Sequence, residues 1–187
     1  MKQPQKGEYG WLSARKRWEV LKTAAYFSLT AAIFITGWIS TKTTANLLTI
    51  VAVLGCLPAG KSCVSMIMFL RITGCSHGLY SRIREAYGET FGYYHLFFTS
   101  YEKNYEIHHL YLKGGTVAAY SENQKIDPHA AGSHLLAMLR QAGISDVTVK
   151  VFTNETEYLA RLKEMTSLKP AGGKDERIRE SLFNVSL

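Results

Sequence analysis

Two long apolar segments near the N-terminus constrain this chain of 187 residues more than any other feature. Residues 23–41 contain no charged side chain, and residues 47–70 contain a single one, Lys61. A membrane-spanning helix needs about 20 mostly apolar residues, so each segment is long enough to cross a bilayer. Because only residues 42–46 separate the two segments, the sequence predicts a transmembrane helical hairpin over residues 23–72.

Basic residues flank the two apolar segments unevenly. Between the segments there is only Lys42, whereas the outer flanks carry Lys2, Lys6, Arg15, Lys16, Arg17, Lys22, Arg71, Arg82 and Arg84. Lys and Arg are enriched on the cytoplasmic side of membrane proteins. The sequence therefore predicts a multi-pass protein of the cell membrane with the lipid bilayer as a partner, both termini cytoplasmic, and residues 1–22 forming a basic cytoplasmic segment.

The net charge of +7 raises the question of nucleic-acid binding. Residues 1–74 hold nine Lys and Arg against two acidic residues, whereas residues 75–187 hold thirteen of each sign. A nucleic-acid-binding domain carries its basic patch on the folded domain. Here the excess lies beside the apolar segments, so no nucleic-acid partner is expected.

Residues 55–62, GCLPAGKS, match the phosphate-binding pattern G-x-x-x-x-G-K-[ST], with Gly55, Gly60, Lys61 and Ser62 at its fixed positions. In that pattern the loop backbone cradles phosphates, Lys contacts them, and Ser or Thr binds Mg²⁺. The segment that follows is apolar on all sides, which suits lipid better than the face of a sheet. No downstream apolar run ends in the acidic residue that would hold Mg²⁺. Nucleotide binding at this loop is kept as an alternative.

The rest of the chain predicts a small cytoplasmic α/β domain over residues 77–166, with a polar C-terminal tail, or alternatively a frayed helix, over residues 167–187. A Gly-Gly pair between two apolar runs indicates a hairpin, and Asp127 followed by Pro128 indicates a helix start. Asn154, three residues before Glu157, indicates another helix start as a variant of the capping box. The expected order is α-β-β-β-α-β-α, with elements near residues 77–87, 91–100, 107–113, 116–122, 128–142, 147–153 and 155–165.

Residues 105–123, YEIHHLYLKGGTVAAYSEN, resemble the nuclease-related (NERD) branch of PD-(D/E)xK-like domains. Glu106, Ile107, His109 and Gly114-Gly115 fall in matching places of its strand pair. The resemblance implies that the metal-binding Asp of the family would stand at His108, its Glu near Tyr120 and its Lys near Glu122. Those residue types are absent, so it implies a relative without catalytic activity.

All six histidines lie in the predicted domain, and His95, His108, His109 and Glu122 are the candidate metal ligands. Zinc accepts imidazole and carboxylate ligands. His108 and His109 should point to opposite faces of their strand, so a metal site would need convergence with a distant residue such as His95. A metal-dependent hydrolase or nuclease-like domain is therefore the enzymatic alternative.

No other combination of residues predicts catalysis, and no cofactor is expected. The sequence predicts a membrane-tethered α/β module that acts by binding or as a scaffold, with a protein partner or self-association. The aromatic residues of 93–98, together with Tyr111 and Tyr120, are its candidate contact face, and the alternative, which the sequence favours, is that they belong to the core.

Overall fold

The computed structural model describes residues 4–100 and 103–187. Residues 1–3, which belong to the expected basic segment 1–22, and residues 101–102 lie outside the described residues. The chain divides into two units: Leu12–Ile72 forms a helical hairpin, and Thr73–Leu187 with the N-terminal residues up to Trp11 forms an α/β domain.

The helical hairpin consists of α1 (Trp11–Thr41) and α2 (Leu47–Arg71), both long and apolar enough to cross a membrane. Asn46 caps α2 by accepting a hydrogen bond from the Thr49 backbone N–H, and its amide group donates to Thr41 and Thr43. These bonds satisfy polar groups of the tight connection between the helices. A Cβ atom on Gly37 would come within 2.7 Å of the Leu48 side chain, so glycine permits the close approach of the two helices there.

Polar side chains also form contacts toward the start of α1. The buried Thr23 and Ser62 hydroxyl groups lie 2.8 Å apart and form a hydrogen bond between the helices. The buried Glu19 carboxylate forms ion pairs with Arg15 and Lys22 of its own helix. The basic residues expected in a separate segment over 1–22 are thus partly in α1, which is one continuous helix from Trp11.

The α/β domain is built on a sheet of four strands in the order β1-β2-β3-β4. The strands β1 (Tyr93–Thr99), β2 (Asn104–Lys113) and β3 (Thr116–Tyr120) are antiparallel, and β4 (Thr148–Phe152) is parallel to β3. The connection from β3 to β4 contains α4 (Pro128–Gln141), because a parallel pair needs a long crossover.

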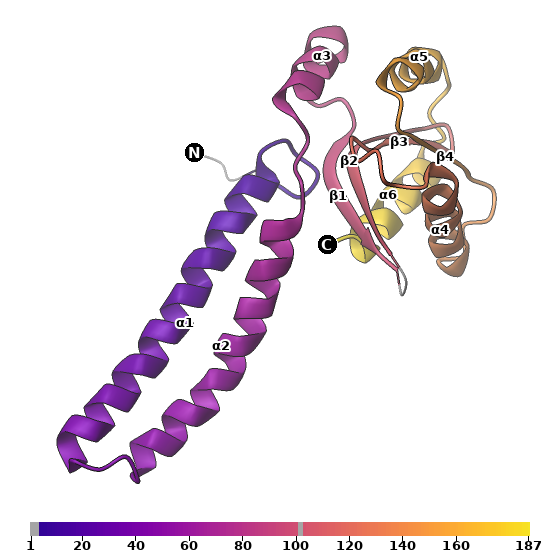
Figure 1. The fold of residues 1–187 in the computed structure, drawn as a ribbon. Coiled ribbons are helices and arrows are strands. Elements are labelled where there is room, and N and C mark those ends of the chain that lie inside the picture. The colour runs from indigo at the N-terminus through magenta and orange to yellow at the C-terminus, as the bar shows by residue number, and fades with distance from the viewer. Residues whose placement is uncertain (1–3, 101–102) are drawn as a thin grey trace. The chain divides into compact units, whose positions relative to one another are not determined.

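Helices cover both faces of this sheet, as Figure 1 shows. One face packs against α3 (His77–Tyr87) and α5 (Glu155–Thr166), and the other packs against α4 and α6 (Gly173–Val185). The predicted order of elements in the domain is confirmed from α3 to α5. The predicted N-caps Asp127 and Asn154 are also confirmed, since each accepts hydrogen bonds from two backbone N–H groups of its helix.

The expected polar tail over residues 167–187 is wrong. This segment contains α6, whose Ile178 and Leu182 are buried in the core against α4 and the sheet. Asp175 of the same helix accepts hydrogen bonds from the backbone N–H groups of Gly114 and Gly115, at 3.0 and 2.7 Å, in the β2–β3 turn. The helix is therefore part of the domain, although most of its residues are polar.

The regular alternation of side chains shifts in the middle of β1 and β2. His95 has a φ of +59°, a left-handed conformation that is uncommon for residues other than glycine. Tyr93 packs with Leu96 and Phe98 in one core cluster, whereas strict alternation would place Tyr93 on the face opposite to theirs. His108 stands opposite His95 in the register, between the pairs Tyr94–His109 and Leu96–Ile107.

Candidate functional site

The segment GCLPAGKS does not form a phosphate-binding loop in this structure. Gly55, Gly60, Lys61 and Ser62 all lie inside the continuous helix α2, which also includes Pro58. A helix interior has its backbone N–H groups committed to intrahelical hydrogen bonds, so they cannot cradle a phosphate. The Ser62 side chain is buried and hydrogen-bonded to Thr23.

His109 is fully buried, and hydrogen bonds engage both ring nitrogens. Its Nε2 lies 2.9 Å from the backbone oxygen of Phe91, and its Nδ1 lies 2.5 Å from the Tyr158 hydroxyl group. Because a carbonyl only accepts, Nε2 carries the proton, and Nδ1 of the neutral ring accepts from Tyr158. Burial lowers the pKa of His109 to about 4, against a smaller opposite effect of the Phe91 carbonyl. His109 is therefore a neutral structural histidine in the core.

The structure brings His95, His108 and Glu122 into one region, where His95 and Glu122 hold the segment Thr73–Ser76. His95 Nδ1 accepts a hydrogen bond from the Cys75 backbone N–H at 3.1 Å. Glu122 accepts one from the Ser76 backbone N–H at 2.8 Å, and its own backbone N–H donates to His108 Nδ1 at 3.1 Å.

Glu106 adds a further bond to this segment, accepting from the Thr73 backbone N–H at 3.2 Å. The segment Thr73–Ser76 is part of the linker between α2 and α3 in the sequence. We call His95, Glu106 and Glu122 the linker-binding cluster, since their side chains accept hydrogen bonds from its backbone. The three side chains come from β1, β2 and the end of β3. A backbone segment without regular structure thereby gains partners for its N–H groups.

Burial favours the neutral forms of His108 and Cys75 in this region. Burial lowers the pKa of His108, although the negative charges of Glu122 and Glu106 act in the opposite direction. Burial, reinforced by the charge of Glu122, raises the pKa of the Cys75 thiol to about 12. A thiol protonated at neutral pH is a poor nucleophile. The region is therefore suited to holding backbone rather than to covalent chemistry.

His108 retains one polar group without a partner. Its Nδ1 accepts from Glu122, so Nε2 carries the proton, and Nε2 is buried with no hydrogen-bond partner in the described residues. Within residues 4–100 and 103–187, no group of three or more His, Cys, Asp and Glu side chains is arranged to hold a metal ion. Of the four candidate metal ligands, His95 and Glu122 belong to the linker-binding cluster. His108 binds the Glu122 backbone, and His109 lies in the core.

We expect His95→Val to lower the free energy of unfolding by about 1–3 kcal/mol, because a β-branched residue tolerates a positive φ poorly. His95→Asn should cost less, since Asn adopts the left-handed conformation and its side-chain oxygen can accept from Cys75. Urea denaturation of the full chain in detergent, followed by near-ultraviolet circular dichroism, measures both variants. Equal losses for Val and Asn would show that the backbone conformation at residue 95 contributes nothing.

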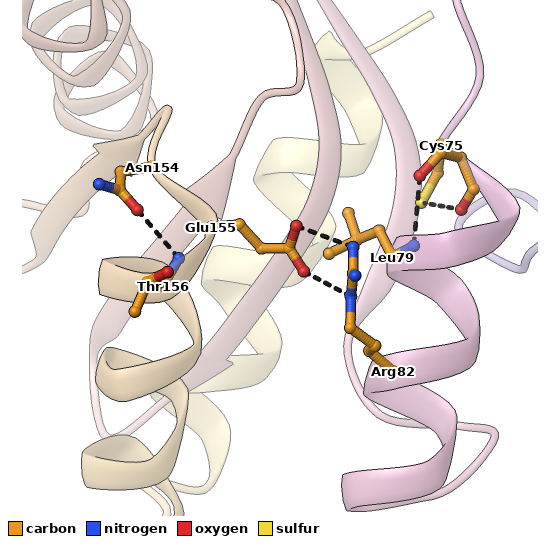
Figure 2. A network of polar contacts seen from close by, with 7 residues as sticks. Cys75, Leu79, Arg82, Asn154, Glu155 and Thr156 are labelled. Atoms are coloured by element: carbon orange, nitrogen blue, oxygen red, sulfur yellow. Dashed lines mark hydrogen bonds and ion pairs between the residues drawn. The ribbon is translucent and has the colours of Figure 1, made fainter.

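A second polar connection joins α3 to α5 on the same side of the sheet. Figure 2 shows Glu155 at the start of α5 reaching Arg82 of α3 through two contacts, of 2.6 and 2.8 Å. The pair is bidentate, which fixes the relative orientation of the two side chains. Its exposure to water limits its contribution to stability to about 1 kcal/mol or less.

Most side chains of residues 93–98 belong to the core, as the favoured interpretation predicts, so they do not form a contact face. Tyr94, Leu96, Phe97 and Phe98 are buried, and so is Tyr120. The aromatic residues that do line open space surround a cavity of about 490 Å³ beside β1, which includes Tyr9, Tyr80, Tyr93 and Phe183. Its walls also carry Lys6, Glu8, Glu89 and Arg179, so they do not define a single class of ligand.

Comparison with protein-family models, with curated proteins and with solved structures finds no match to this chain. The resemblance of residues 105–123 to the NERD branch stays a prediction. The hairpin on which it depends is present, with Gly114 and Gly115 in the turn between β2 and β3.

Sequence reasoning missed Cys75 and Tyr158 as members of these sites. Cys75 contributes through its backbone N–H, which no residue pattern marks. Tyr158 lies four residues after Asn154, on the buried face of α5 with Leu162 and Met165. That helical spacing indicates burial, but it does not reveal that the hydroxyl group meets His109.

Proposed function

We propose that this chain is a membrane-anchored module: α1 and α2 span the cell membrane as a hairpin, and the α/β domain acts on the cytoplasmic side by binding rather than by catalysis. The observation that carries this proposal is the exposed apolar surface of both helices. Leu47, Leu57 and Ile39 are 75%, 72% and 70% exposed. Apolar surface of this extent in a soluble protein marks an interaction site, and a bilayer is the environment that covers a helix on every side.

The charge distribution supports the orientation. Residues 42–46, between the helices, contain one basic residue, Lys42, whereas the opposite end of the hairpin contains Arg15, Lys16 and Arg17. Lys16 donates a hydrogen bond to the Ile72 carbonyl at 2.7 Å, and the Arg15 guanidinium lies 5.4 Å from the centre of the Phe69 ring. Basic residues at this end match the cytoplasmic side of a membrane hairpin.

The structural roles of the histidines support binding rather than catalysis as the proposed role. His95 and His108 accept hydrogen bonds from backbone N–H groups, and His109 binds Tyr158 and Phe91. Each of these side chains therefore has a structural use. The partner is expected to be a protein, or a second copy of the chain.

The exposed Cys56 of α2 tests the membrane proposal. In the Cys63→Ser variant, where Cys75 is buried, a membrane-impermeant maleimide applied to inside-out vesicles should leave Cys56 unlabelled until detergent is added. A matched Lys125→Cys variant, carrying Cys56→Ser and Cys63→Ser, should label at once because residue 125 is exposed in the cytoplasmic domain. Immediate labelling of Cys56, or protection of residue 125 in these vesicles, would refute the proposal.

A further inference from the structure

The two edge strands of the sheet, β1 and β4, differ in whether their outer backbone groups have hydrogen-bond partners. At the β1 edge, the Tyr94 backbone N–H donates to the Gly7 carbonyl at 2.7 Å, and the Leu187 N–H donates to the Phe97 carbonyl at 2.9 Å. Both ends of the chain thus place backbone partners on β1. An uncovered edge strand is a template for pairing with another chain, and at β1 the protein itself supplies partners.

The β4 edge has no such cover in the described part of the chain, where β4 pairs only with β3. The Thr148 N–H donates to the Gly115 carbonyl, and the Phe152 carbonyl accepts from the Ser121 N–H. In a parallel ladder, alternate residues of a strand bond to the same neighbour. Val149 and Val151 therefore direct their backbone N–H and C=O groups away from β3, toward the open side.

A groove runs along this open side, between β4 and α4, which lie next to each other in Figure 1. Its volume is about 430 Å³, and its lining includes Pro128, Gly132, Leu136, Val149 and Val151. Gly132 has no side chain, and a Cβ atom there would be in ordinary contact with the Val149 carbonyl oxygen, at 3.8 Å, so a larger side chain would extend into the groove. The groove thus combines a mainly apolar wall, to which His129 and Ser133 add polar side chains, with unpaired backbone groups of an edge strand.

We propose that this groove binds an extended segment of a partner protein, which adds to the sheet as a strand beside β4 and places an acidic side chain next to Lys150. Addition of a strand obtains affinity from main-chain hydrogen bonds and specificity from alternate side chains. Small apolar residues of the segment would face α4. This inference rests on the proposed role of the domain as a binding module and names its binding surface.

The charge of Lys150 selects the partner segment over a second copy of the chain. Lys150 is exposed at the middle of β4, and no carboxylate of the described residues forms an ion pair with it. Its Nζ lies 4.9 Å from the centre of the Phe152 ring, on the face away from α4. Two antiparallel copies of β4 centred on this residue would place like charges directly opposite, which is destabilising. An acidic residue at that place has the complementary charge.

The test uses the full chain in lipid nanodiscs and a library of random short peptides displayed on phage. Selected peptides should alternate small apolar and polar positions and contain an acidic residue. Val149→Pro removes an outward N–H and leaves the bonds to β3, which proline at an edge permits. Gly132→Leu fills the groove and suits a helix. Each variant should weaken binding of the selected peptides by about tenfold or more.

Lys150→Glu is the matched charge variant, and it should select basic peptides in place of acidic ones. The inference is overturned if both Val149→Pro and Gly132→Leu bind the selected peptides as the native chain does, if no peptide is selected, or if the native chain dimerises through β4. Circular dichroism verifies that each variant is folded. Retention of the chain in carbonate-washed membranes is measured separately, so loss of anchoring and loss of peptide binding are distinguished.

Discussion

Leu182→Ala is expected to lower the free energy of unfolding of the α/β domain by about 2–5 kcal/mol, the range for a buried leucine that leaves a cavity. Leu182 is 1% exposed and belongs to the same core cluster as Leu135 and Leu139 of α4 and Leu110 of β2. Removal of its side chain would leave a cavity between α6, the sheet and α4. Urea denaturation of the full chain in detergent, followed by near-ultraviolet circular dichroism, measures the change.

Val185→Ala is the matched control, because Val185 lies in the same helix and is 41% exposed. It should change stability by less than about 0.5 kcal/mol, as surface substitutions usually do. A loss below about 1 kcal/mol for Leu182→Ala would mean that α6 is a detachable tail after all.

Acidification is expected to destabilise the domain by about 3 kcal/mol through His109 alone. An unfolded histidine has a pKa of about 6.5, and burial lowers the pKa of His109 to about 4 in the folded domain. Between these values the unfolded chain binds more protons, so stability is fully present above about pH 6.5 and decreases as the pH falls toward 4. One pKa unit corresponds to about 1.4 kcal/mol. Urea denaturation over this pH range measures the slope.

His109→Gln should flatten this pH dependence, because glutamine does not titrate, while it lowers stability at neutral pH by disrupting the bonds to Tyr158 and Phe91. The slope that remains is assigned to His108, whose pKa burial also lowers. His129→Gln is the control, since His129 is exposed. An unchanged slope in His109→Gln would show that His109 is not the group that titrates.

Element order was predictable because its signals are local. Turn glycines, the caps Asp127 and Asn154, and helical spacing each act within a few residues, and they gave the domain correctly as far as α5. The last helix was missed because most of its residues are charged or polar. Ile178 and Leu182 carry the i, i+4 spacing of a buried face, but two apolar positions among many polar ones also suit a solvated tail.

The candidate site was less predictable, because it depends on pairing between distant segments. His95 and His108 are placed near each other by the register of β1 and β2, and this register cannot be predicted from the local sequence. His95 also leaves the regular strand conformation, so the expected alternation of His108 and His109 could not locate their partners. Glu122 was named as a metal ligand, whereas its carboxylate binds the Ser76 backbone.

Cover of the β1 edge by Gly7 and Leu187, which are far apart in the sequence, sets an order of events during synthesis. The helical hairpin lies near the N-terminus, so it leaves the ribosome well before Leu187. The Lys6 ammonium group donates to the carbonyls of Phe183 and Ser186, and Leu187 itself bonds to Phe97. These contacts cannot form until residues 183–187 emerge. A hairpin that enters the membrane as it is synthesised, as proposed, would therefore carry an unfinished domain with an open β1 edge until this segment is available to cover it.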